Sequence, residues 1–127
     1  YLKFWYNYTN GENNKMAAGT YNFTIEQGAN FTRVLSLKEN DSVMNLTGYS
    51  VASQMRSTHD SSTVVGTFTG SVTNGSGGEI TLLMSNSTTG GIEEGIYVYD
   101  VEITNGTSGA ITRILQGRVT VTPQVTR

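Results

Sequence analysis

Apolar and polar residues alternate along most of the chain after Thr20, and this pattern limits the possible folds more than any other feature. Tyr21, Phe23 and Ile25 fall on one face of the segment, and the polar residues between them fall on the other. A period of two is typical of a β-strand with one buried face. No stretch keeps the 3.6-residue period of an amphipathic helix, so the sequence predicts an all-β protein.

The alternation, read between turn signals such as Asn105-Gly106, predicts a series of short strands. We expect them at Thr20–Gln27, Phe31–Lys38, Tyr49–Arg56, Val64–Thr69, Glu79–Met84, Gly95–Thr104 and Ala110–Thr122. In the last of these, Ile111, Leu115, Val119 and Val121 share a face. Seven to nine such strands indicate a β-sandwich or a β-barrel, and the form that we expect is an immunoglobulin-like antiparallel β-sandwich. The residues expected to pack in its core are Tyr21, Phe23, Ile25, Leu35, Leu37, Val51, Tyr97, Tyr99, Val101, Leu115 and Val119.

Three residues interrupt the strand pattern. Arg33 falls on the apolar face of its segment, so we expect it near a sheet edge or with its charged end reaching solvent. Gly70 is expected to end the strand Val64–Thr69. Gly117 lies within the last expected strand, where a glycine indicates a bulge or the close approach of another backbone.

The length of 127 residues fits a single domain. Residues 1–15 are atypical, because this segment holds the only Trp and three of the seven Tyr. One interpretation is that Met16 is the natural start and that residues 16–127 form the sandwich. The other is that Leu2–Tyr8 is a genuine N-terminal strand that covers a sheet edge.

The composition excludes several classes of partner and chemistry. Charged residues make up 14% of the chain, the net charge is −2 and the isoelectric point is near 5.2, so a nucleic-acid interface is not expected. No apolar run approaches the ~20 residues of a membrane-spanning helix. The absence of cysteine removes thiolate catalysis and cysteine zinc sites.

The chain offers few groups for catalysis. His59 is the sole histidine, and a triad built from it with Asp60 or Asp100 lacks any nucleophile motif. Asp100 and Glu102 alternate outward on one strand and fit a solvated face better than a glycosidase pair. Calcium ligands at Asn40-Asp41 or Glu93-Glu94 lack the spacing of a calcium loop. We therefore expect no catalytic residue, no metal and no cofactor.

Two segments are candidate protein interfaces. The N-terminal segment carries the aromatic residues Phe4, Trp5, Tyr6 and Tyr8, and these cannot all face inward on one strand. The segment Arg118–Thr122 is the other, with Arg118, Thr120 and Thr122 as its candidate contacts. As an unpaired edge strand it would accept a strand from a neighbour.

The strands near the C-terminus resemble a known group of phage proteins. The segment Gly95-Ile96-Tyr97-Val98-Tyr99-Asp100-Val101, followed by Arg113-Ile114-Leu115-Gln116-Gly117-Arg118-Val119, is similar to a strand–turn–strand pattern in the N-terminal domain of phage baseplate upper proteins. Residues 21–28, 31–33 and 46–56 fit the same pattern, so the resemblance spans about Met16–Arg127. It implies a small virion structural protein with an immunoglobulin-like fold in a tail, baseplate or neck, and it brings no catalytic residue.

Three interpretations of function follow. The first is a non-enzymatic virion protein, made in the bacterial host cytoplasm, that assembles with other virion proteins or with copies of itself. The second is a carbohydrate-binding or adhesin-type sandwich, which would need an exposed aromatic platform beside polar loops. The third is an enzyme, which the residues favour least.

Overall fold

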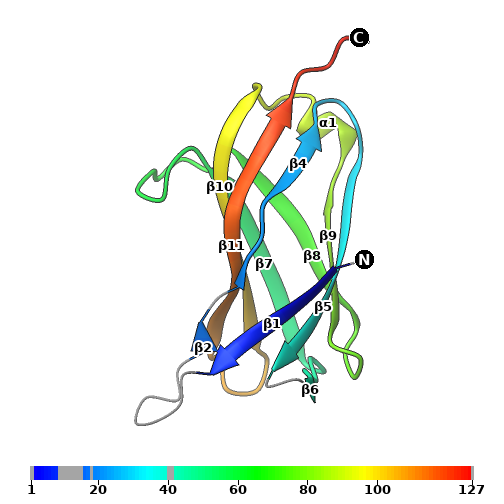
Figure 1. Cartoon of the computed structure of the whole chain (residues 1–127), viewed down its shortest axis with the longest axis vertical. Helices are drawn as coiled ribbons and strands as arrows, with labels where there is room; N and C mark the ends of the chain where they lie inside the picture. The colour runs from blue at the N-terminus through cyan, green and yellow to red at the C-terminus, as the bar shows by residue number, and fades with distance from the viewer. Residues whose placement is uncertain (1, 9–15, 18, 40–41, 127) are drawn as a thin grey trace.

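The computed structural model describes residues 2–8, 16–17, 19–39 and 42–126, and the side chains of residues 19–38 and 42–126. Within these ranges the chain is almost entirely β-structure (Figure 1). The elements are β1 (Leu2–Tyr8), β2 (Met16–Ala17), β3 (Gly19–Thr20), β4 (Phe23–Glu26), β5 (Phe31–Glu39), β6 (Ser42–Val43), β7 (Tyr49–Arg56), β8 (Gly66–Asn74), β9 (Glu79–Met84), α1 (Asn86–Thr89), β10 (Gly95–Asn105) and β11 (Ile111–Thr122). The all-β prediction is confirmed.

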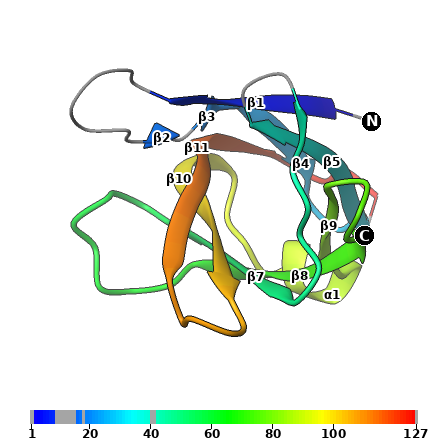
Figure 2. The same cartoon turned by 90° about the horizontal axis from the view of Figure 1, so that it is seen from below.

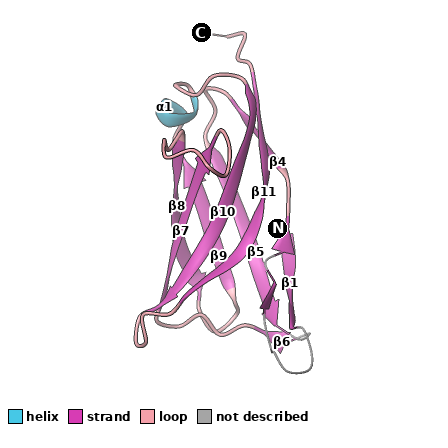
Figure 3. Cartoon of the chain, turned by 90° about the vertical axis from the view of Figure 1, so that its left-hand side faces the viewer, coloured by secondary structure: helices cyan, strands magenta, loops and turns pink. Residues whose placement is uncertain are grey.

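The strands form one continuous hydrogen-bonded path, in the order β2-β1-β5-β9-β8-β7-β10-β11-β3. The first part of β8, Gly66 to Phe68, pairs with β7, and the rest of β8 pairs with β9. The sheet therefore curls through β8 into two facing halves (Figure 3). This is a curled, mixed half-barrel in which all the strands belong to one hydrogen-bonded sheet.

Gly70 lies where β8 passes from one half of the sheet to the other. A Cβ atom at this position would lie 2.6 Å from Val51 Cγ1, so only glycine lets β7 and β8 approach this closely. The expectation that the strand ends at Gly70 is wrong, because the strand continues to Asn74. The glycine permits the curl of the sheet.

The two ends of the sheet path meet near the N-terminus. β1 pairs in parallel with β5 and antiparallel with β2, whereas β3 and β4 pair in parallel with β11. Only Ala18 separates β2 from β3 in the sequence. Seen from below, β1 lies across the opening between β5 and β11 (Figure 2). Leu2–Tyr8 is therefore a strand at the edge of β5.

The prediction that Arg118–Thr122 is an unpaired edge is wrong. β10 pairs with this part of β11 on one side, and β4 pairs with Val119 to Thr122 on the other. The sequence could not show this, because the partner strand β4 lies almost a hundred residues earlier in the chain. Both edges of this segment are therefore already paired, and a strand from a neighbour has no free edge to join there.

The core fills the space between the two halves of the sheet. Of the eleven residues predicted to form it, eight are buried: Phe23, Ile25, Leu35, Leu37, Tyr99, Val101, Leu115 and Val119. Tyr21, Val51 and Tyr97 are half-buried and pack against these residues. The rings of Phe23 and Phe31 stack with centroids 4.9 Å apart, and the ring of Tyr99 lies 4.6 Å from Phe23. These contacts join β4, β5 and β10 across the interior.

One predicted inward residue points outward instead. Ile111 is 64% exposed, while both Ile114 and Leu115 are buried. The cause is a β-bulge, since the register shifts between the pairs Val101↔Leu115 and Glu102↔Arg113. The extra residue reverses the alternation on the N-terminal side of the bulge.

Arg33 lies at the open side of the half-barrel, as its interruption of the apolar face predicts. Its guanidinium sits over the ring of Phe31, with the carbon atom Cζ 5.1 Å from the centroid, and also 5.8 Å from that of Phe23. Its Nε atom is buried and has no hydrogen-bond partner among the described residues. The side chain therefore covers the gap between β4 and β5 by packing on aromatic rings.

Candidate functional site

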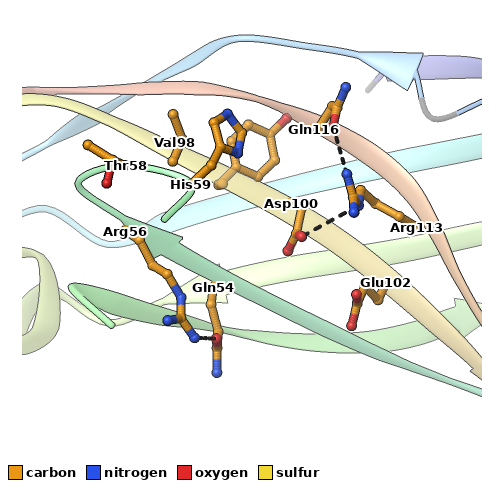
Figure 4. A pocket seen from close by; sticks show the side chains of 10 residues that line it. Gln54, Arg56, Thr58, His59, Val98, Asp100, Glu102, Arg113 and Gln116 are labelled. Carbon is orange, nitrogen blue, oxygen red and sulfur yellow. Dashed lines mark hydrogen bonds and ion pairs between the residues drawn. The ribbon is translucent and has the colours of Figure 1, made fainter. Parts of the chain in front are cut away.

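A polar groove of about 300 Å³ crosses the outer face of β7, β10 and β11 (Figure 4). The residues Tyr99 and Val101 of β10 are buried, so Val98, Asp100 and Glu102 between them point outward. Each of these three lies in register with one residue of β7 and one of β11. The outer face is therefore a set of three rows that run across the strands, and we call this surface the outer groove.

The first row carries positive charge. Val98 of β10 is flanked by Arg56 of β7 and by Arg118 of β11. His59, from the loop of residues 57–65, lines the groove at the same end. Among the described residues, no acidic group lies within ion-pair distance of Arg56, Arg118 or His59. We call these three residues the basic end.

The second row is built around a neutralised carboxylate. Asp100 lies between Gln54 and Gln116, and its Oδ2 atom is 3.7 Å from Nε of Arg113. The Arg113 Nη1 donates a hydrogen bond of 3.1 Å to Oε1 of Gln116. Both members of the ion pair are about half exposed, so the pair orients side chains more than it stabilises the fold.

The third row holds Glu102 between Ala52 and Arg113. Asp100, Glu102 and Arg113 together carry one net negative charge. This end is therefore acidic. It lies about 13 Å along β10 from the basic end, which is the length of four residues of extended strand. The outer groove has opposite charge at its two ends.

The loop of residues 57–65 forms one wall of the groove and is held in place from its base. Arg56 Nη1 donates to the carbonyl oxygen of Ser61 at 2.7 Å, and Arg56 Nη2 donates to Gln54 Oε1 at 3.0 Å. The backbone N–H of Val65 donates to the carbonyl of Met55 at 2.9 Å. These bonds fix the position of His59 before any ligand binds.

A second hollow of about 290 Å³ adjoins the basic end. It shares His59, Val98 and Gln116 with the outer groove and adds Arg118 and Asn22. The Asn22 Oδ1 atom accepts a hydrogen bond of 2.8 Å from the backbone N–H of Arg118, which positions the start of this hollow. The polar surface therefore continues past the basic end toward β4.

The backbone beneath the groove depends on Gly117 and Tyr99, which are cross-strand partners. A Cβ atom on Gly117 would lie 2.1 Å from the carbonyl oxygen of Tyr21, so this glycine allows the close backbone approach that the sequence predicts. The buried hydroxyl of Tyr99 donates to that same carbonyl at 2.6 Å. Burial, more than the nearby Tyr21, raises the pKa of Tyr99 above its ordinary value of 10.0.

The groove brings together His59, Asp100 and Glu102, which were separate candidates in the sequence. No hydrogen bond joins His59 to a hydroxyl or a carboxylate among the described residues. Within the same residues no group of three or more His, Asp or Glu side chains is placed to hold a metal ion. The described geometry of the groove offers charge and hydrogen bonds to a ligand.

The predicted interface residues fall in different places. Arg118 is exposed at the basic end, Thr120 is exposed and Thr122 is half-buried, all on β11. Phe4, Trp5, Tyr6 and Tyr8 belong to β1, but their side chains lie outside the described residues. Sequence reasoning missed Arg56, Gln54 and Gln116 as groove residues, although their outward positions on expected strands were a readable signal.

Aromatic platforms, which a carbohydrate-binding surface would need, are absent from the described surface. Every aromatic side chain that the structure describes is buried or half-buried. In the outer groove the aromatic residue is Tyr99, which is only 2% exposed.

No described helix has the length and apolar character needed to cross a membrane.

Comparison with solved structures relates this half-barrel to a phage protein. The N-terminal domain of phage TP901-1 ORF48 matches with a TM-score of 0.54 and 11% identity, over 95% of this chain and 98% of that one. InlP of Listeria monocytogenes matches with a TM-score of 0.45 and 18% identity, over 83% of this chain and 28% of InlP, which is too weak to bear on the fold. No protein-family model and no curated protein sequence matches the chain.

The first of these similarities covers nearly the whole of both chains. At 11% identity it establishes a shared fold and nothing about activity. The sequence motifs indicated a resemblance to the N-terminal domain of phage baseplate upper proteins, and the structure confirms a similarity in fold to the N-terminal domain of a phage protein.

Proposed function

We propose that this chain is a non-enzymatic structural protein of a phage particle, and that it works by docking other virion proteins. The observation that carries the proposal is the fold shared with the N-terminal domain of a phage protein over almost the full length of both. A tail, baseplate or neck is the expected location, after synthesis in the host cytoplasm. The description of the half-barrel as a variant of the immunoglobulin-like sandwich is part of the same proposal.

The charged groove supports a docking role. An interface needs fixed polar groups of both signs to set partner and register. The outer groove has such groups on three neighbouring strands and one anchored loop. Copies of this chain are also candidate partners. The aromatic residues of β1 are a second candidate contact surface.

Quantitative mass spectrometry of gradient-purified particles tests the proposal. Particles are collected from the bacterial host that carries the gene, together with the unsedimented lysate. A structural protein is expected at a fixed number of copies per particle, and a gold-labelled antibody should mark one region of the particle. Recovery of the chain only in the unsedimented lysate would overturn the proposal.

A matched assay separates the docking role from the carbohydrate-binding alternative. The purified protein is applied to a glycan array and, in parallel, to blotted virion proteins. Binding to a virion protein without glycan binding is expected. Glycan binding alone would favour the adhesin-type interpretation.

A further inference from the structure

We propose that the outer groove binds an extended segment of a partner protein that carries an acidic residue, a neutral polar residue and a basic residue at alternate positions. The inference rests on the proposed docking function and specifies the chemistry of the partner. It depends on how the register of β7, β10 and β11 distributes charge along the groove.

Spacing is the first argument. Same-face positions along β10 repeat every two residues, which is about 6.6 Å in an extended chain. Residues i, i+2 and i+4 of an extended peptide repeat at the same distance. A peptide that lies along β10 would therefore place successive same-face side chains over Val98, Asp100 and Glu102.

Charge is the second argument. Arg56, His59 and Arg118 surround Val98 and lack a described acidic partner, so this position favours a carboxylate. Glu102 at the other end favours a lysine or an arginine. Between them, the amides of Gln54 and Gln116 can donate and accept hydrogen bonds, so a neutral polar side chain fits there.

The same charges disfavour a nucleic acid. The two arginines of the first row are followed within about 7 Å by Asp100, whose charge Arg113 neutralises, and then by Glu102. A phosphate backbone along the groove would carry its repeated negative charge from the basic end onto the Glu102 carboxylate. With a net charge of −2 on the chain, the groove lacks the continuous positive strip that such a ligand needs.

Synthetic peptides test the inference directly. The probe is acetyl-Ser-Glu-Thr-Gln-Thr-Lys-Ser-amide, and its reverse order is tested as well because an extended peptide can run in either direction. The controls carry Glu at both charged positions or Lys at both. Binding is followed by NMR chemical shifts of the ¹⁵N-labelled protein at low salt, where exposed charges are least screened.

A mixed-charge peptide in at least one direction is expected to bind roughly threefold or more tightly than either control, with shifts at Val98, Asp100 and Gln116. Arg118→Gln should weaken this binding roughly threefold to fivefold. Thr32→Glu, at an exposed position of β5 in the facing half of the sheet, makes the same change in net charge and should leave binding unchanged. Arg118→Glu should shift the preference toward the peptide with two lysines.

Three results would overturn the inference: equal binding of all peptides, shifts confined to another surface, or tighter binding of a dT10 oligonucleotide or a heparin hexasaccharide. Any of them leaves the proposed virion function standing if the chain is found in particles. Absence from particles removes the proposed function without altering the peptide result.

Discussion

The hydroxyl of Tyr99 is the single polar group whose removal tests most about the interior. Tyr99→Phe keeps the ring among Phe23, Phe68 and the rest of the core, and it removes the 2.6 Å hydrogen bond to the carbonyl of Tyr21. The loss of a buried partner leaves that carbonyl oxygen without its donor. We expect the free energy of unfolding at pH 7 to fall by about 1–3 kcal/mol. For a domain of this size, this lowers the melting temperature by roughly 4–10 °C.

The pH dependence of the same variant has a defined sign. Burial raises the pKa of Tyr99 in the folded protein above the value of 10.0 that applies to the unfolded chain. The stabilisation is therefore complete below pH 10 and is lost as the pH rises further, because only the unfolded phenol ionises. At pH 11 the wild type loses about 1.4 kcal/mol through this group. The phenylalanine variant is spared that loss, so the difference in stability between the two proteins should narrow by that amount.

Urea unfolding of both proteins at pH 7, 10 and 11, followed by far-ultraviolet circular dichroism, measures these quantities. Tyr97 is present in both proteins, and its own raised pKa, caused by burial and by the nearby Glu93, cancels in the comparison. A stability difference near zero at pH 7, or one that stays constant up to pH 11, would refute the described role of Tyr99.

Three further substitutions probe separate features. Gly117→Ala places a Cβ atom against the Tyr21 carbonyl and should lower the free energy of unfolding by about 1–3 kcal/mol, measured by thermal or urea unfolding. Unchanged stability would contradict the close approach of β3–β4 to β11. Thr89→Val removes the fully buried hydroxyl that donates to the Ala29 carbonyl at 2.8 Å and accepts from the Gly28 N–H. The free energy of unfolding is therefore expected to fall by about 1–3 kcal/mol. No change would show that α1 does not hold the β4–β5 turn. Arg113→Gln breaks an exposed ion pair with Asp100 and an exposed hydrogen bond to Gln116, and it should change stability by less than about 1 kcal/mol. A larger loss would mean that the groove is part of the stabilising structure.

The sequence predicted the local structure well because alternation is a local property. The strands Tyr49–Arg56 and Glu79–Met84 begin and end where the pattern places them, and four of the others differ by a few residues. The expected strand Thr20–Gln27 is instead divided into β3 and β4, with residues 21 and 22 outside both. The buried aromatic residues Phe23 and Tyr99 also follow from period-two spacing alone. Gly117 could be interpreted correctly because a glycine inside a strand has few physical explanations.

The parts that the sequence did not predict depend on which distant strands are neighbours. The pairing of β4 with β11 closes the supposed free edge at Val119–Thr122, and nothing in either segment specifies the other. The bulge at Ile114 exposes Ile111 because one residue without a partner reverses the alternation. The curl at Gly70 joins the two facing halves into one sheet, because β8 pairs first with β7 and then with β9.

The candidate site shows the same division between local and distant information. The sequence placed Asp100 and Glu102 together on an outer face, and the structure puts both in the groove. The basic end could not be predicted, because Arg56, His59 and Arg118 come together only when β7, β10 and β11 are aligned in register. A side-chain pattern identifies the face of each strand, and the topology decides which faces form one surface.

Photo-cross-linking at position 98 in assembled particles tests most directly whether the outer groove is a docking site. A benzophenone amino acid replaces Val98, the purified particles are irradiated, and the adducts are identified by mass spectrometry, with position 107 as the control. We expect an adduct with another virion protein from position 98 only, at a segment with an acidic residue near the cross-link. Equal yields at both positions, or no adduct at position 98 in particles that contain the chain, would contradict it.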